Sequence, residues 1–253
     1  MNERPVSGFW PLGGTSVKSA MAIILIDMQL DFCAAGGWID QLGEDVSNTR
    51  AVIPPISQAL AAARSAGIAV IHTREGHLPD LSDLHANKQW RTRVHGLGIG
   101  DMGAIGRILV RGEPGWQIIP ELAPEAEELV IDKPGKSAFH QTDLEAELRK
   151  RGISRLVITG VTSDCCVQST MRDGFERGFE CVLLEDCTAA VETPNHLATL
   201  EILKAYGGRW GGGSSLAAFQ SRRAVAVGLS LRATPPPDGS RATSLALRRL
   251  LGR

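Results

Sequence analysis

Short apolar runs alternate with amphipathic segments along most of this chain. Uninterrupted runs rich in β-branched residues predict strands at 22–27, 68–72, 129–131, 156–161 and 181–184. Between and after these runs, helical spacing predicts helices over 49–66, 142–151, 163–177 and 194–205. Gly67 is a predicted C-terminal cap, and Thr142 with Glu145 is a capping-box pattern. The alternation predicts an α/β fold, namely a doubly wound, mostly parallel sheet with helices on both faces, a Rossmann-like three-layer sandwich.

Three segments lack this alternation. We interpret residues 1–20 as an irregular N-terminal leader and residues 222–253 as a C-terminal tail rich in Arg and Pro. Residues 21–221 form one predicted domain between them. Inside it, the stretch 74–120 is long for a loop, and its Ile and Trp residues favour a packed segment with a function.

Composition and charge exclude several classes of protein. The formal net charge of −1 argues against a general nucleic-acid binder, which needs a basic face. The apolar run at 20–26 is too short to span a bilayer, and the charged residues at 3–4 do not resemble a signal peptide. The five cysteines are odd in number and two are adjacent, which fits a reducing compartment. We therefore expect a cytoplasmic protein with no nucleic-acid or membrane partner.

Three chemically distinctive residues follow predicted strands. Asp27 ends the first strand, Lys133 ends the third, and Cys166 lies just after the fourth. Since ligands of open α/β sheets bind outside the carboxyl ends of the strands, these side chains are expected to meet in one site. Each alone has an ordinary structural explanation, as a turn residue, a solvated ammonium or a small buried thiol. It is their joint placement that favours catalysis.

The trio suits nucleophilic catalysis. A thiolate is the reactive form of cysteine, so Asp27 is expected to accept the proton of Cys166 and later return it to a leaving amine. Lys133 is expected to steady both negative charges. The backbone N–H groups at the start of the helix near Ser163 could bind the oxyanion of an attacked carbonyl.

Three motifs resemble those of the isochorismatase-like cysteine hydrolases. They are the segments 24–32 (Ile-Leu-Ile-Asp-Met-Gln-Leu-Asp-Phe), 132–134 (Asp-Lys-Pro) and 159–173, which contains Cys165-Cys166-Val167. The resemblance covers about residues 20–220 and implies a triad of Asp27, Lys133 and Cys166. It also implies a cis peptide bond before Thr162 and an oxyanion hole formed by Thr162 and Cys166. The family places its nucleophile directly before Val, which selects Cys166 and assigns Cys165 to packing.

Within that family the substrate loops look most like those of biuret and triuret hydrolases. The likeness rests on the segments 72–77, 86–88, 111–116, 132–136 and 185–187. It implies substrate contacts from Phe32, Arg74, Lys136 and Tyr206, the last standing where biuret hydrolases carry a Gln. We therefore expect a cysteine amidohydrolase that cleaves a C–N bond of a small linear ureide, triuret or biuret, and releases ammonia through a thioester-like intermediate.

Several alternatives remain open at this point. One is a ureidoacrylate or N-carbamoyl amide hydrolase with the same triad, and another is a non-catalytic binding protein on the same fold. Nicotinamidases of the family bind a metal through an Asp-x-His-type motif, whereas this chain has Arg74-Glu75-Gly76-His77 there, so we predict no metal and no cofactor. The resemblance also implies a homo-oligomer, either a tetramer or a dimer.

Overall fold

A parallel sheet forms the centre of the molecule. The computed structural model describes residues 20–94 and 96–221, so the predicted leader up to residue 19 and the predicted tail lie outside it. The sheet has six strands, and every hydrogen-bonded pair in it is parallel. In spatial order they are β5 (Leu129–Lys133), β2 (Ala69–Glu75), β1 (Met21–Ile26), β6 (Arg155–Val161), β7 (Glu180–Ala189) and β8 (Gly212–Ser214). The predicted fold class is confirmed.

The central strand β1 shows why its sequence forms a strand. All six of its residues are buried, because helices cover both faces of the sheet. Ile23 and Leu25 face one hydrophobic cluster, whereas Ile24 and Ile26 face the other. Successive residues of a strand point to opposite faces, so an apolar residue is needed at every position here.

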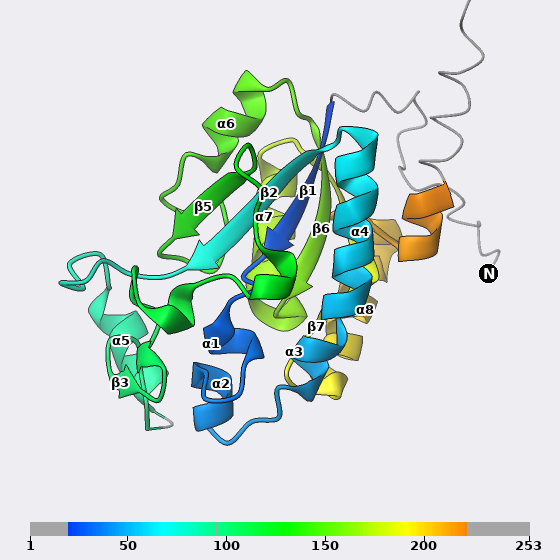
Figure 1. Ribbon diagram of the computed structural model, residues 1–253. Helices are drawn as coiled ribbons and strands as arrows, with labels where there is room; N and C mark the ends of the chain where they lie inside the picture. Colours follow the sequence, from blue (N-terminus) through cyan, green and yellow to red (C-terminus); the bar gives the residue numbers. More distant parts are fainter. Residues whose placement is uncertain (1–19, 95, 222–253) are drawn as a thin grey trace, which may run out of the picture.

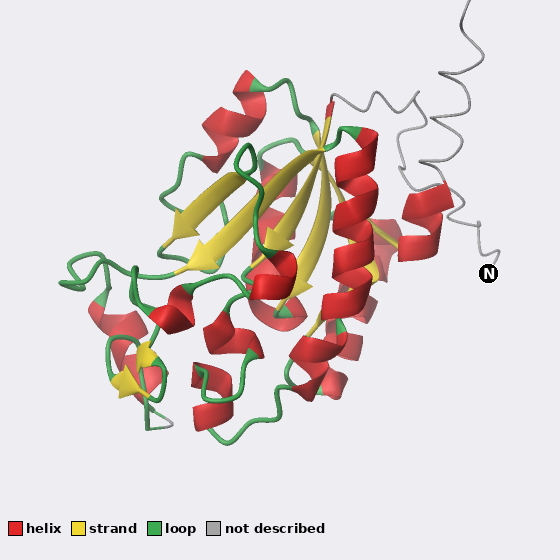
Figure 2. Ribbon diagram, in the orientation of Figure 1, coloured by secondary structure: helices red, strands yellow, loops and turns green. Residues whose placement is uncertain are grey.

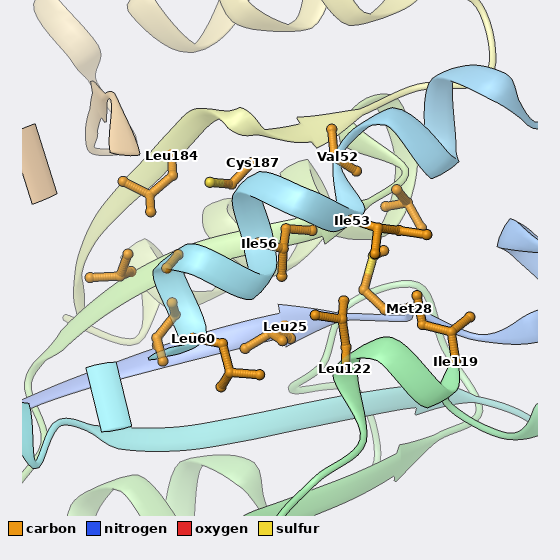
Figure 3. Close-up of a cluster of buried hydrophobic side chains, with 14 of the residues drawn as sticks. Leu25, Met28, Val52, Ile53, Ile56, Leu60, Ile119, Leu122, Leu184 and Cys187 are labelled. Carbon is orange, nitrogen blue, oxygen red and sulfur yellow. The ribbon is translucent and has the colours of Figure 1, made fainter. Parts of the chain in front are cut away.

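Helices form the two outer layers (Figures 1 and 2). On one face, α4 (Ile53–Ala66), which follows the short α3 (Ser47–Ala51), buries apolar residues such as Ile56 and Leu60 against Leu25 (Figure 3). The other face is covered by α6 (Leu144–Lys150), α7 (Gln168–Glu176) and part of α8 (Thr193–Gly208). No helix within residues 20–94 and 96–221 is long and apolar enough to cross a membrane.

The long stretch after β2 is ordered, as its apolar content predicts. It contains α5 (Ala86–Arg93), the short strands β3 (Met102–Gly103) and β4 (Gly106–Arg107), and the 3-10 turns η2 (Pro114–Trp116) and η3 (Pro120–Leu122). With α1 (Leu30–Cys33) and α2 (Trp38–Gln41), this segment lies beyond the carboxyl ends of β1 and β2 (Figure 1). It thus covers the edge at which the site was expected.

Several local predictions need correction. Thr142 and Glu145 form no capping box, because α6 begins after Asp143 and Thr142 Oγ1 instead donates to the Ala138 carbonyl at 2.6 Å. The segment 163–177 opens with a π-helical turn, η4 (Ser163–Val167), before α7. Strand β2 continues three residues beyond the predicted end at 72, and β8 was not predicted. Gly67 does cap α4, with a φ of 67°.

One glycine allows β1 and β6 to come together beside the site. Gly160 pairs with Ile26 and has a φ of 105°, and a Cβ there would lie 2.1 Å from the Ile26 carbonyl oxygen. Gly160→Ala should therefore destabilise the fold by about 1–3 kcal/mol from φ alone, with the backbone clash adding to this. Urea-induced unfolding measures the loss.

Gly152→Ala is the matched control for that substitution. Gly152 has a φ of 66°, but nothing lies within 4 Å of a Cβ built on it. If the two variants were equally stable, the close approach of β1 and β6 would not be what requires Gly160.

Candidate active site

The three predicted catalytic residues meet at the carboxyl edge of the sheet. Lys133 Nζ lies 2.7 Å from Asp27 Oδ2, and both side chains are fully buried. The thiol of Cys166 belongs to the same group, because its sulfur lies within 4.8 Å of carboxylate oxygens of Asp27 and Glu75. Residues that are remote along the chain are therefore close enough for proton transfer and charge stabilisation.

Asp27 is held by its neighbour on β2. The hydroxyl of Thr73 donates to Asp27 Oδ1 at 2.6 Å and accepts the Asp27 backbone N–H at 3.2 Å. Asp27 has a φ of 50°, a conformation that Asp tolerates better than most residues. This turn directs the chain out of β1 and leaves the carboxylate at the strand end.

Lys133 supplies a positive charge to the buried carboxylates of Asp27 and Glu75. Its Nζ contacts Asp27 at 2.7 Å, donates to the Gly135 carbonyl at 2.9 Å, and lies 3.8 Å from Glu75 Oε2. Burial alone would lower the pKa of this ammonium, but the neighbouring acidic groups, Asp27 foremost, outweigh it and raise the pKa. Lys133 therefore stays charged at neutral pH.

Cys166 lies in the π-helical turn η4, directly after β6. The peptide bond between Val161 and Thr162 is cis, as the resemblance implied. The Thr162 carbonyl accepts the N–H groups of Cys165 and Val167, both at 3.1 Å, so the turn closes on itself. π-Helical turns of this kind are frequent at functional sites.

The two adjacent thiols have different surroundings. Cys166 is buried and its Sγ lies 3.4 Å from Glu75 Oε2, whereas Cys165 is partly exposed. A hydrogen bond with Cys165, together with burial, raises the pKa of the Cys166 thiol well above its ordinary value. The same hydrogen bond lowers the pKa of Cys165 to about 7. A buried thiol of this kind needs a nearby base to become a nucleophile.

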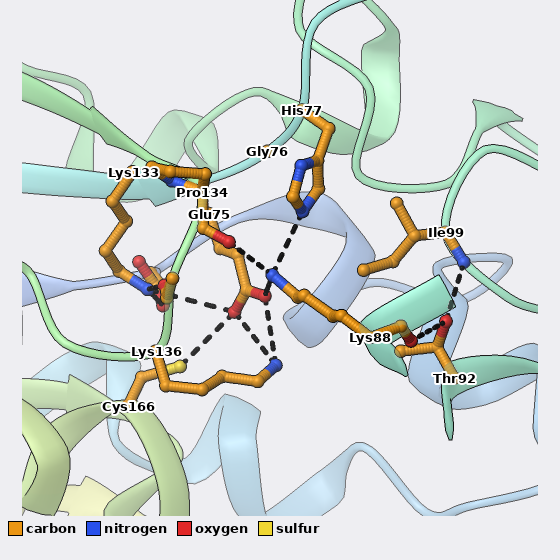
Figure 4. A network of polar contacts seen from close by, with 12 residues as sticks. Glu75, Gly76, His77, Lys88, Thr92, Ile99, Lys133, Pro134, Lys136 and Cys166 are labelled. Carbon is orange, nitrogen blue, oxygen red and sulfur yellow. Dashed lines mark hydrogen bonds and ion pairs between the residues drawn. The ribbon is translucent and has the colours of Figure 1, made fainter. Parts of the chain in front are cut away.

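Glu75 is the main residue that the sequence analysis missed. Its carboxylate is fully buried and lies at the centre of a cluster with Lys88, Lys133, Lys136 and Cys166 (Figure 4). Burial raises the pKa of this carboxyl, but the three ammonium groups outweigh it and bring the pKa well below its ordinary value. Glu75 ends β2 just as Asp27 follows β1, so the strand-end rule could have found it. It was missed because the strand predicted from the sequence ended at residue 72, whereas β2 continues to Glu75.

Gln29 fixes the backbone on both sides of Glu75 and was also missed. Its side-chain oxygen accepts the Glu75 N–H at 2.7 Å, and its Nε2 donates to the carbonyls of Glu75 and Trp116, both at 2.9 Å. Three buried backbone groups from two segments are thereby satisfied by one amide. The end of β2 is rigid as a result.

Of the predicted substrate contacts, the structure brings only Lys136 to this cluster. Lys136 Nζ lies 2.9 Å from Glu75 Oε1, and 39% of its side chain is exposed. Arg74 instead pairs with Asp132 at 2.7 Å and stacks on the ring of Trp116, because side chains alternate along β2.

Phe32 and Tyr206, the other two residues predicted to contact substrate, pack against other parts of the chain. Phe32 packs into the hydrophobic cluster on the α4 face, 6.3 Å from the ring of Trp38. Tyr206 is 82% exposed and contacts Arg209, because the chain leaves helical geometry at residues 205–207.

The carboxylates of Asp27 and Glu75 and the sulfur of Cys166 are also close enough to share a metal ion. The ammonium of Lys133 already contacts both carboxylates. A divalent cation would have to enter beside this fixed positive charge, so the donor set suits an ammonium better than a metal.

The chain was then compared with known proteins. The Isochorismatase domain family matches residues 21–211. Ureidoacrylate amidohydrolase RutB of Yersinia enterocolitica is 37% identical over 191 residues, which are 74% of this chain and 80% of that protein. RutB of Enterobacter sp. is 38% identical over 178 residues, 66% of this chain and 74% of that protein.

Solved structures agree with this assignment. A cysteine hydrolase from Pseudomonas syringae pv. phaseolicola superposes with a TM-score of 0.71 at 28% identity, covering 83% of this chain and 95% of that one. The prediction of an amidohydrolase agrees with the curated relatives, although these favour the ureidoacrylate alternative over biuret or triuret. From the domain match, the sequence identity and the fold, the chain belongs to the isochorismatase family.

Proposed function

We propose that this protein is a cysteine amidohydrolase that cleaves a C–N bond of a small ureide carrying a carboxylate, of the ureidoacrylate type. The observation that carries the proposal is the buried group of Asp27, Lys133 and Cys166 at one sheet edge. The curated relatives that share 37% identity with the chain are ureidoacrylate amidohydrolases, which supports this substrate class.

The proposed reaction has two steps. In the first, Asp27 accepts the proton of Cys166, and the sulfur forms a bond to the ureide carbonyl carbon. The C–N bond then breaks, and Asp27 returns the proton to the departing nitrogen. In the second, Asp27 takes a proton from water, whose oxygen attacks the same carbon; the C–S bond breaks, and Asp27 passes the proton to the sulfur. Lys133, 2.7 Å from Asp27 Oδ2, balances the negative charge of the base between the steps.

Charge in the transition state would be stabilised by the turn that carries the nucleophile. We assign the oxyanion hole to the backbone N–H groups of Thr162 and Cys166, next to the cis peptide bond. Fixed donors of this kind act without reorganising during the reaction.

Lys136 is the residue that we assign to the substrate carboxylate. Its ammonium and the sulfur of Cys166 both contact Glu75 Oε2, at 3.2 and 3.4 Å, so they lie on the same side of the cluster. Among residues 20–94 and 96–221, the ammonium groups of Lys88, Lys133 and Lys136 form ion pairs with the carboxylates of Asp27 and Glu75 alone, so the cluster has one excess positive charge. An anionic substrate fits this excess better than neutral biuret or triuret.

A panel of four ureides tests the substrate class. Purified enzyme is given ureidoacrylate, its saturated analogue N-carbamoyl-β-alanine, biuret and triuret, and ammonia release is followed for each. We expect kcat/KM for the carboxylated pair to exceed that for the neutral pair by about 10-fold or more, as one charge-assisted hydrogen bond provides. Faster hydrolysis of biuret or triuret would instead support the narrower sequence-based prediction of a linear-ureide hydrolase.

A further inference from the structure

We propose that Glu75 is a positioning residue for Cys166: it holds Lys133 and Lys136 on two sides of the nucleophile and accepts the hydrogen bond of its thiol. The proposal rests on the proposed function in taking Cys166 as the nucleophile. Nothing in the three motifs that resemble the family includes Glu75.

A buried carboxylate is costly unless its partners compensate it. Glu75 has no exposed surface, and three lysines from different segments surround it, Lys88 at 2.6 Å, Lys136 at 2.9 Å and Lys133 at 3.8 Å. Gln29 binds both its N–H and its carbonyl, so the backbone cannot shift to expose the side chain. An ordinary surface ion pair has one partner and is exposed to water, whereas Glu75 is buried and has three charged partners.

Lys88 is the anchor of this arrangement rather than a substrate contact. Its Nζ donates to Glu75 Oε1 at 2.6 Å, to the Pro134 carbonyl at 2.5 Å and to His77 Nε2 at 3.0 Å. An ammonium has three donors, so all of them are used. Lys88 thereby ties α5 to the ends of β2 and β5.

Lys136 and Lys133 differ from Lys88 because their ammonium groups interact with the thiol of Cys166. Lys136 is 39% exposed, so it can reach a ligand in solvent, while Lys133 is shared between Glu75 and Asp27. Loss of the Glu75 charge would release Lys136 from its ion pair, while Lys133 would keep its contacts with Asp27 and the Gly135 carbonyl. Lys136 would then no longer have a fixed place beside the sulfur, and Lys133 would lose its link to that part of the cluster.

The charged groups that face Cys166 set the direction of the expected effect. Asp27 and Glu75 disfavour the thiolate, whereas Lys133 and Lys136 favour it. Within its own turn Cys165 shares a hydrogen bond with it, and His196 of α8 contacts the same turn but binds Ser163 Oγ at 3.0 Å. Removing the Glu75 charge should therefore make the thiol ionise at lower pH, and removing the Lys136 charge should do the opposite.

The test measures alkylation of Cys166 by iodoacetamide as a function of pH, without substrate. Peptide mass spectrometry separates this thiol from the others, and the variants are made in a Cys165→Ala background. We expect Glu75→Gln to move the midpoint down by about 1 pH unit and Lys136→Met to move it up. A loosened fold would shift both variants in the same direction, which would overturn the proposal.

Steady-state kinetics give the second measurement. Glu75→Gln should lower kcat/KM by about 100-fold, with KM raised through Lys136 and kcat lowered through Lys133. Glu75→Asp keeps the charge, so its alkylation midpoint should stay near that of the parent although kcat/KM remains low. Glu75→Asp also provides the kinetic measurement if Glu75→Gln does not fold. For Glu75→Gln, a parental midpoint together with kcat/KM within about threefold of the parent would contradict the proposal.

Asp83→Asn is the matched control. Asp83 Oδ1 lies 3.1 Å from His77 Nδ1, so it belongs to the same α5 region, but three contacts in series separate it from Glu75. Its loss should leave the alkylation midpoint unchanged, and a shift as large as that of Glu75→Gln would count against a specific role of Glu75. Because alkylation needs no substrate, an enzyme that cleaves none of the four ureides would refute the proposed function and leave this test intact.

Discussion

Cys166→Ala is expected to reduce ammonia release by about 10³-fold or more, because no other group in the cluster can form the covalent bond to the carbonyl carbon. The fold should persist, since the change removes one sulfur from a buried site. Steady-state ammonia release and circular dichroism on the same preparation measure the two quantities. Retention of most of the activity would falsify the covalent mechanism.

The adjacent cysteine provides the control for that experiment. Cys165→Ala removes a partly exposed thiol that shares a hydrogen bond with Cys166 but is not one of the three side chains to which we assign the reaction. We expect it to keep most of the ammonia release. Loss of activity in Cys165→Ala together with its retention in Cys166→Ala would mean that the family's nucleophile motif had been aligned to the wrong cysteine.

Lys133→Met is expected to destabilise the protein by about 3–5 kcal/mol and to abolish activity, because it leaves a buried carboxylate without its partner. Asp27 has no exposed surface and depends on this ammonium at 2.7 Å. Methionine approximates the aliphatic part of the lysine side chain and lacks its charged ammonium group. Urea-induced unfolding measures the free energy, and ammonia release measures the activity.

Lys136→Met removes the same charge from a position that is 39% exposed. Solvent can compensate there, so the free energy of unfolding should fall by only about 1 kcal/mol. Similar losses at both positions would show that Lys133 does not carry the special cost of a buried pair. The comparison separates the burial of the charge from the charge itself.

The sheet was largely predictable because its signal is local. A run such as 22–26 is apolar at every position only where both faces are covered, so β1 could be identified from its own residues. The capping box predicted at Thr142 was wrong because capping depends on contacts that are not local to the helix. Whether a hydroxyl binds its own helix or the Ala138 carbonyl depends on how the preceding turn packs, and the pattern of residues does not contain that information.

Substrate contacts were the least predictable part. The structure brings Lys136 to the cluster, whereas Arg74, Phe32 and Tyr206 contact other residues. For Arg74 the side chain's direction depends on how far β2 extends, and for Tyr206 it depends on the break in α8. A resemblance transfers the position of a residue along the chain but not the direction of its side chain.

By itself, the sequence determined the parallel sheet and the three strand ends that carry Asp27, Lys133 and Cys166, because apolar runs are local and parallel strands end at one edge. Only the tertiary structure decided that Glu75 lies among three lysines and that Gln29 holds its backbone. Those contacts join segments far apart in the chain, and their energies depend on burial and distance, which no pattern of residues specifies.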